Sequence, residues 1–142
     1  MDLPITFKGM VYPWQLDHMG HFNVQFYVAM FDQSTWALLA SVGLGASFFT
    51  RERRRMAAVE QKITYRQELF PGDLVENRSG IVEVRDKVIR IFHDMRLAET
   101  GVLAARAELV TVFVDADAGR ATVLPADIRD RARALLVIPE SL

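Results

Sequence analysis

The segment Asp17-His18-Met19-Gly20-His21-Phe22-Asn23 holds the residues whose types and spacing could do chemistry, immediately before a long apolar run. If that run is a helix, its N-terminus offers unpaired backbone N–H groups that can polarise a carbonyl and hold the resulting oxyanion. A carboxylate held nearby, such as Asp17, can activate water or attack directly. The segment therefore suits acyl transfer without serine, cysteine or metal. A purely structural alternative stays open, in which Asp17 caps a turn, Asn23 caps the helix and His21 is a surface residue.

Other chemistries have less support in the residues. His18 and His21 lie three apart and could be imagined with Asp17 as metal ligands, but no H-E-x-x-H pattern accompanies them, so we predict no metal site. The G-x-G-x-x-G, Walker A and G-x-S-x-G motifs are missing, so no cofactor is predicted. The chain has no cysteine, which excludes disulfides and a cysteine nucleophile. His93 lies on the apolar face of a strand, where a hydrogen-bonded core histidine is a simpler interpretation than a catalytic one.

The composition limits the class of protein. With 142 residues, 51% of them hydrophobic, the chain predicts one folded domain over residues 1–142. No stretch approaches the roughly 20 apolar residues of a membrane span, and the N-terminus MDLPITFKGM does not resemble a signal peptide. The net charge of −1 argues against nucleic acid, whose phosphates demand a basic face. We therefore expect a cytoplasmic protein with neither a nucleic-acid nor a membrane partner.

A long helix from about Asn23 to Val42 must position the Asp17 segment. Asn23 suits the N-cap position, and Gly43 would end the helix. Asp32, the lone acidic residue in this stretch, is interpreted as a structural hydrogen-bonding group. Apolar side chains cover most of the helix surface, so we expect it to be buried rather than lying on the outside. The i, i+3, i+4, i+7 spacing is carried by Val24, Tyr27, Val28, Phe31, Thr35, Leu38, Leu39 and Val42.

The chain from Met56 to Val114 is typical of β-structure, because apolar and polar residues alternate along it. In its first strand, Val59, Ile63 and Tyr65 share the apolar face. The connections are too short for helical crossovers, so the strands should pair antiparallel. With a first strand over residues 5–12 and a last helix over residues 125–136, the sequence predicts an α+β fold in which a curved antiparallel sheet wraps around the central helix.

The motif Asp17-x-x-Gly20-His21-x-Asn23, followed by Tyr27 and by Pro71-Gly72-Asp73, resembles the hotdog-fold acyl-CoA thioesterases of the 4-hydroxybenzoyl-CoA thioesterase type. The similarity extends from about Ile5 to Val114. It implies a single hotdog domain that hydrolyses a thioester to free acid and coenzyme A. It also implies that Asp17 is the nucleophile or general base, that a backbone N–H near Val24 polarises the carbonyl, and that active sites lie between subunits. We expect His21 to help orient Asp17 or the thioester.

The acyl group is left open by the sequence. The pair His21 and Asn23 is more similar to thioesterases of acyl-CoA and acyl-carrier protein than to aromatic-acyl members. The run Ile91-Phe92-His93-Asp94-Met95-Arg96 resembles, more weakly, the betainyl-CoA thioesterases of carnitine breakdown. A non-catalytic module that binds acyl-CoA as a sensor or carrier is the alternative function. Asp17 beside a helix N-terminus favours the enzyme, because binding alone would not need a base there.

Coenzyme A is a phosphorylated anion, so cationic side chains are expected near the site. Two clusters qualify: Arg51-Glu52-Arg53-Arg54-Arg55 on a loop after the helix, and Arg85-Asp86-Lys87 at a hairpin turn. We assign Arg85 and Lys87 to substrate binding together with Glu60, which could also assist catalysis. A solvated surface charge is the alternative for these residues, and it is the commoner role of any single arginine.

The outer face of the predicted sheet points to assembly. Charged residues such as Arg106 and Glu108 share a strand face there with apolar ones. A mixed outer face of this kind suggests burial against another subunit. We therefore predict a homodimer at least, or a homotetramer. The other members of this mixed face are Arg90, Arg96, Val102, Val110, Val112 and Val114.

Overall fold

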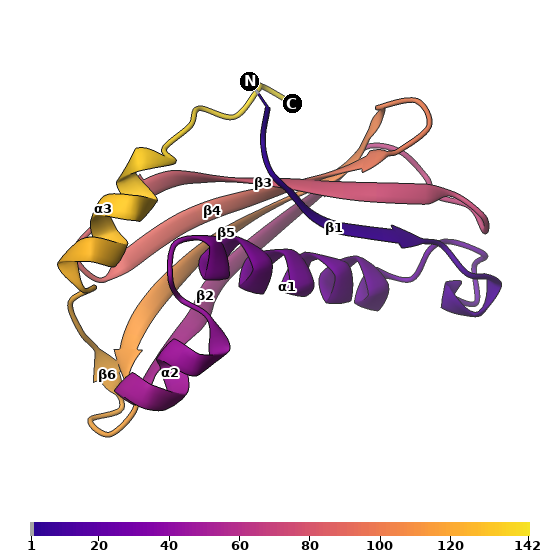
Figure 1. Cartoon of the computed structure of the whole chain (residues 1–142). Helices are drawn as coiled ribbons and strands as arrows, with labels where there is room; N and C mark the ends of the chain where they lie inside the picture. The colour runs from indigo at the N-terminus through magenta and orange to yellow at the C-terminus, as the bar shows by residue number, and fades with distance from the viewer. Residues whose placement is uncertain (1) are drawn as a thin grey trace.

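An antiparallel sheet forms the body of the computed structural model, which describes residues 2–142 (Figure 1). The strand order is β1-β3-β4-β5-β2, and the short β6 pairs with β5. Every strand pair is antiparallel. Short hairpins join β3 to β4, β4 to β5 and β5 to β6, which requires this orientation for those pairs. The strands are β1 (Ile5–Met10), β2 (Arg54–Tyr65), β3 (Leu74–Val84), β4 (Val88–Leu97), β5 (Leu103–Asp115) and β6 (Arg120–Ala121).

Helix α1 (Val24–Ser41) lies along one face of the sheet, which curves around it (Figure 1). It begins after Asn23 and ends at Val42, and Gly43 follows with φ +101°, a left-handed conformation that favours glycine. The predicted helix and its two end signals are therefore confirmed. So is the predicted α+β fold of a curved antiparallel sheet around a central helix. The buried residues of α1 are Tyr27, Met30, Phe31, Ser34, Thr35, Leu38 and Leu39.

The expectation that α1 is buried holds for only one of its faces in the single chain. Val24 is 55% exposed and Trp36 is 43% exposed. The sheet covers only one side of the helix, and the other side lies open near β2, the edge strand. An apolar surface left open in this way is typical of a contact with another molecule.

The structure has further short elements that the sequence did not predict. A 3₁₀ turn, η1 (Pro13–Gln15), precedes the Asp17 segment, and helix α2 (Ala46–Glu52) follows α1. The cluster at residues 51–55, expected on a loop, instead spans the end of α2 and the start of β2. Phe48 and Phe49 of α2 pack against the core, which explains why this segment folds onto the body. The last helix, α3 (Ala126–Ala134), lies within its predicted range.

A bulge in β2 corrects the predicted face of Val59. The register with β5 shifts between Ala58 and Glu60, so the alternation of inner and outer residues changes there. Val59 is 62% exposed, whereas Met56, paired with Phe113, is buried in the core. The bulge could not be predicted, because it depends on the pairing with another strand.

The outer face of the sheet is partly covered by the chain's own C-terminal tail. Arg106, 4% exposed, donates to both carboxylate oxygens of Asp94 and to the backbone oxygen of Glu140. Arg96 of β4 lies 3.8 Å from the Glu140 carboxylate. Burial of Arg106 therefore comes from this chain itself, and the expected second subunit is not needed to explain it.

His93 is a core histidine, as predicted. Its ring is fully buried between the sheet and α1, 2.6 Å from the Ser79 hydroxyl and 2.8 Å from the Thr35 hydroxyl. Because Thr35 donates to the Phe31 carbonyl oxygen, its own oxygen accepts from Nε2 of His93. Burial lowers the pKa of His93 to about 3, so the imidazole is neutral at physiological pH.

Candidate active site

The Asp17 loop is closed on itself by hydrogen bonds. Oδ1 of Asp17 accepts from the backbone N–H of Met19 at 2.8 Å and of His21 at 3.0 Å. The Asp17 N–H in turn donates to the His21 carbonyl oxygen at 2.8 Å. Gly20 has φ +80°, which a side chain would strain, and its N–H donates to the Asp17 carbonyl oxygen. The glycine of the motif is therefore explained by the turn.

These contacts define the state of the Asp17 carboxyl. The His21 N–H, followed by the Met19 N–H and the nearby imidazoles, lowers the pKa of Asp17 below its ordinary value. The group is therefore a carboxylate at neutral pH. Its Oδ1 is occupied by the turn, whereas Oδ2 has no hydrogen-bonding partner within residues 2–142. Oδ1 thus holds the loop in place, while Oδ2 remains available for a reaction.

The loop is fixed against the start of α1. Leu16 and Phe22 form a β-bridge, and the N–H of Asn23 donates to the Gln15 carbonyl oxygen at 2.9 Å. Asp17 and Asn23 are therefore held on either side of one narrow hairpin. This places the carboxylate beside the residues that lead directly into the helix.

The first turn of α1 leaves one N–H open. The Asn23 side chain accepts from Gln25, and the Asn23 carbonyl oxygen accepts from Phe26. Within the described chain the N–H of Val24 has no such partner. It therefore remains free for an outside acceptor, at the positive end of the helix dipole.

The two histidines of the loop differ in their surroundings. His21 Nε2 lies 3.5 Å from the Glu68 carboxylate, and both side chains are exposed. His18 is exposed on the same loop. No group of metal-binding side chains gathers here among the described residues. Glu68 escaped the sequence analysis because it lies in an irregular segment with no pattern around it.

Tyr27, the helix residue of the motif, is buried beside the loop. Its ring contacts Phe22 at 4.6 Å and Tyr65 at 4.9 Å between centroids. Burial, with smaller contributions from Tyr65 and Glu68, raises the pKa of Tyr27 to about 12. The phenol therefore stays protonated and packs the helix N-terminus against the end of β2.

A cavity of about 310 Å³ opens between α1 and the edge strand β2. It extends along the helix from Gln25, in the first turn, to Leu39, and its floor includes Leu109 and Thr111 of β5. The cavity therefore begins at the end of the helix where the Val24 N–H is free. Its walls are mostly apolar, as an acyl-binding space requires.

The structure does not bring Arg85 and Lys87 near Asp17 in the single chain. Asp17 follows β1, whose end pairs with the Leu74 end of β3, whereas the Arg85–Lys87 turn follows the opposite end of β3 (Figure 1). At about 3.3 Å per residue, the 11 residues of β3 separate these ends by roughly 35 Å.

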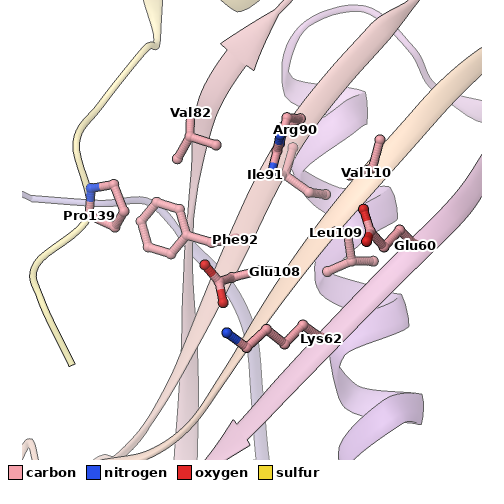
Figure 2. Close-up of a pocket in the computed structure, with 10 residues that line it drawn as sticks. All are labelled: Glu60, Lys62, Val82, Arg90, Ile91, Phe92, Glu108, Leu109, Val110 and Pro139. Carbon is pink, nitrogen blue, oxygen red and sulfur yellow. The ribbon is translucent and has the colours of Figure 1, made fainter.

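Glu60 also lies away from the Asp17 loop. It lines a groove of about 330 Å³ on the outer face of the sheet with Lys62, Arg90 and Glu108 (Figure 2). Its pairing partner in β5 is Val110, at mid-strand, whereas the Asp17 loop lies at the Tyr65 end of β2. The structure thus brings together Asp17, His21, Asn23 and Val24, and leaves Glu60, Arg85 and Lys87 elsewhere.

Comparison with known proteins defines the family. Residues 11–132 match the model of the Thioesterase-like superfamily. The chain therefore belongs to that superfamily, and it is a thioester hydrolase with the hotdog-like fold of its class. This confirms the predicted enzyme class and the broader part of the resemblance, while the 4-hydroxybenzoyl-CoA type stays a prediction.

Individual relatives agree with this assignment. The betainyl-CoA thioesterase of Pseudomonas aeruginosa is 26% identical and covers 96% of this chain and 90% of its own length. A Staphylococcus aureus protein solved in complex with CoA superposes with a TM-score of 0.87 at 18% identity, over 99% of this chain and 92% of that one. The probable thioesterase YbaW of Escherichia coli has a TM-score of 0.79 at 20% identity, over 94% and 100%.

Proposed function

We propose that this protein hydrolyses an acyl-CoA thioester, with Asp17 as nucleophile or general base and the Val24 N–H as the group that polarises the carbonyl. The observation that carries the proposal is the pairing of a carboxylate oxygen and a helix N–H that both lack partners within residues 2–142, on one hairpin fixed by its own hydrogen bonds. Pre-organised groups of this kind stabilise developing charge most effectively. The CoA complex of the Staphylococcus aureus relative supports CoA as the thiol part of the thioester.

The reaction would begin with the thioester carbonyl oxygen accepting a hydrogen bond from Val24. As nucleophile, the Asp17 carboxylate attacks the carbonyl carbon, the C–S bond breaks, and water then hydrolyses the mixed anhydride. As general base, Asp17 instead takes a proton from the water that attacks. In both routes the oxyanion lies at the helix N-terminus, and CoA leaves as a thiolate that takes up a proton.

His21 and Asn23 act as positioning residues in this scheme. The backbone N–H of His21 holds Oδ1 of Asp17, and its imidazole lies beside Glu68. Asn23 ties up the Gln25 N–H, which leaves Val24 as the free donor. These contacts give both residues a role without requiring either to react.

The open edge of the sheet supports a homodimer or homotetramer. β2 is an edge strand whose residues 58–62 are exposed, and the active-site cavity opens at this edge. Unpaired edge strands readily pair with another chain. If two β2 strands pair antiparallel, the Arg54 end of one copy lies beside the Tyr65 end of the other. The residue 51–55 cluster would then stand near the other copy's Asp17 loop, where CoA phosphates need cations.

The substrate-binding roles expected for Arg85, Lys87 and Glu60 also require a second copy of the chain. The turn at Arg85–Lys87 lies roughly a strand length from Asp17 in the same chain, so it cannot serve that site. We keep these residues as substrate contacts across the interface. Among the described residues no helix could span a membrane.

For the acyl group of the substrate, a betainyl group is the second candidate. The relative from Pseudomonas aeruginosa is named a betainyl-CoA thioesterase and matches nearly the whole chain. Betaine carries a quaternary ammonium, so a thioesterase of this type needs a place for a positive charge beside the thioester.

A thiol-release assay tests the proposal. The protein is offered short, long, aromatic and cationic acyl-CoAs, and CoA appearance is followed with a thiol reagent while binding is measured by calorimetry. Turnover of at least one thioester is expected. Tight binding of several with turnover of none would instead support the non-catalytic sensor or carrier.

A further inference from the structure

Among the described residues that line the cavity between α1 and β2, one has an ionisable side chain, namely Asp32. Its walls otherwise consist of apolar and neutral polar residues. An acyl group that fills this space therefore meets a single negative charge and no positive one. The remaining lining residues are Gln25, Val28, Ala29, Thr35, Trp36, Leu39, Met56, Ala58, Gln61, Leu109 and Thr111.

Asp32 is held in place by the indole of Trp36. Nε1 of Trp36 donates to Oδ1 of Asp32 at 3.2 Å, and the Trp36 ring packs edge-on against Phe49 with 6.1 Å between centroids. This contact agrees with the structural hydrogen-bonding role that the sequence predicts for Asp32. The carboxylate nevertheless lies on the cavity wall and is exposed, which a purely structural role does not require.

A negative charge at Asp32 would discriminate between acyl groups. An apolar acyl chain in the cavity would take water away from the carboxylate and give it no counter-ion, which disfavours binding. A quaternary ammonium offers charge without hydrogen-bond donors, and it is recognised by carboxylates and by the faces of aromatic rings. The Asp32 carboxylate and the Trp36 indole lie together on the cavity wall.

The position along the helix fits a short acyl chain. Asp32 follows Val24 by eight residues, about 12 Å at 1.5 Å per residue. Helical side chains point back toward the N-terminus, which shortens the distance to the free N–H. A thioester carbonyl at Val24 would thus direct its acyl group along the cavity toward Asp32.

Resting on the proposed function, we infer that Asp32 and Trp36 form the acyl-recognition site and select a trimethylammonium-bearing acyl group. Betainyl-CoA and the longer 4-trimethylammoniobutyryl-CoA are the substrates of this class. Their neutral counterparts, in which carbon replaces the ammonium nitrogen, have nearly the same shape. Any difference between the two forms therefore reports on charge.

The test compares kcat/KM for each cationic thioester and its neutral counterpart in the wild type, Asp32→Asn and Trp36→Leu. Asparagine keeps an oxygen that can accept from Trp36 and removes only the charge. We expect the cationic substrate to be preferred at least tenfold, and Asp32→Asn to lower its kcat/KM about tenfold while leaving the neutral form unchanged or improved. Trp36→Leu should reduce the same preference, and Trp36→Phe should retain more of it.

Asp130→Asn is the matched control, because Asp130 is an exposed carboxylate on α3 outside the cavity. It should leave the preference unchanged. Equal rates for cationic and neutral forms in the wild type, or an equal loss on both in Asp32→Asn, would overturn the inference while thiol release still supports the thioesterase. No thiol release from any thioester contradicts the proposed function instead. Binding of the cationic form alone, lost in Asp32→Asn, would even then support the recognition site.

Discussion

The side chain of Asn23 accepts a hydrogen bond from the backbone N–H of Gln25 at 3.1 Å. The same residue's carbonyl oxygen accepts from Phe26, so Asn23 satisfies two N–H groups of the first helical turn. The N–H of Val24, which precedes both Gln25 and Phe26, is left for substrate. Helix stability and the proposed oxyanion site thus depend on one residue.

Replacing Asn23 by alanine should therefore affect both properties. Loss of an N-cap costs about 1 kcal/mol of folding free energy, and a frayed first turn no longer presents the Val24 N–H in one orientation. We expect Asn23→Ala to lower both Tm and kcat. Asn23→Ser, which can still cap, should retain most of each. Thermal unfolding and thiol release measured on the same preparations check this. An unchanged kcat in the alanine variant would show that the helix cap does not contribute to catalysis.

Buried His93 makes stability dependent on pH. Its pKa is lowered from 6.5 to about 3 by burial, so below pH 6.5 the unfolded chain takes up a proton that the folded chain cannot. The free energy of unfolding should then fall by roughly 1.4 kcal/mol per pH unit until about pH 3, and level off below it. Acidification is thus destabilising, and the full contribution of the neutral ring is present above pH 6.5.

Denaturant unfolding between pH 7 and pH 4 measures this slope. His93→Gln lacks a titrating ring and should show a slope smaller by that amount, even though it loses stability at pH 7 through its contacts with Ser79 and Thr35. The same slope in both proteins would show that His93 is not the group responsible.

Assembly through β2 predicts that a charge at the exposed Val59 separates the subunits. The wild type should be a dimer or tetramer by light scattering at micromolar concentration. Val59→Asp should shift it toward monomer and reduce thiol release in parallel, because the cavity opens at this edge. Val123→Asp, at an exposed residue outside the cavity and β2, should change neither. A wild-type monomer with full activity would contradict the role of the interface.

Local signals predicted what is local in this protein. The apolar spacing of α1, its cap at Asn23 and its end at Gly43 were all present in the sequence, and each depends only on neighbouring residues. The turn around Asp17 was recognisable for the same reason. The Asp17 carboxylate accepts hydrogen bonds from the N–H groups two and four residues later in the chain, and Gly20 allows the turn between them.

Features that depend on distant pairing were not predictable. The bulge that exposes Val59 arises from the register with β5, and the burial of Arg106 arises from the C-terminal tail. The mostly apolar surface of α1 predicts burial, but a single sequence does not distinguish a face that packs in the core from a face that packs against another subunit. Glu68 reaches His21 only through the folding of an irregular segment.

Steady-state thiol release by Asp17→Asn, at saturating concentrations of a thioester that the wild type hydrolyses, tests the central claim most directly. Asparagine retains an Oδ1 that can accept from Met19 and His21, so the loop, Tm and CoA binding should change little. Loss of a catalytic base or nucleophile should lower kcat about 100-fold or more. A near-wild-type kcat would contradict the account: Asp17 would then serve only as the cap of its turn, and Glu60 would become the next carboxylate to replace.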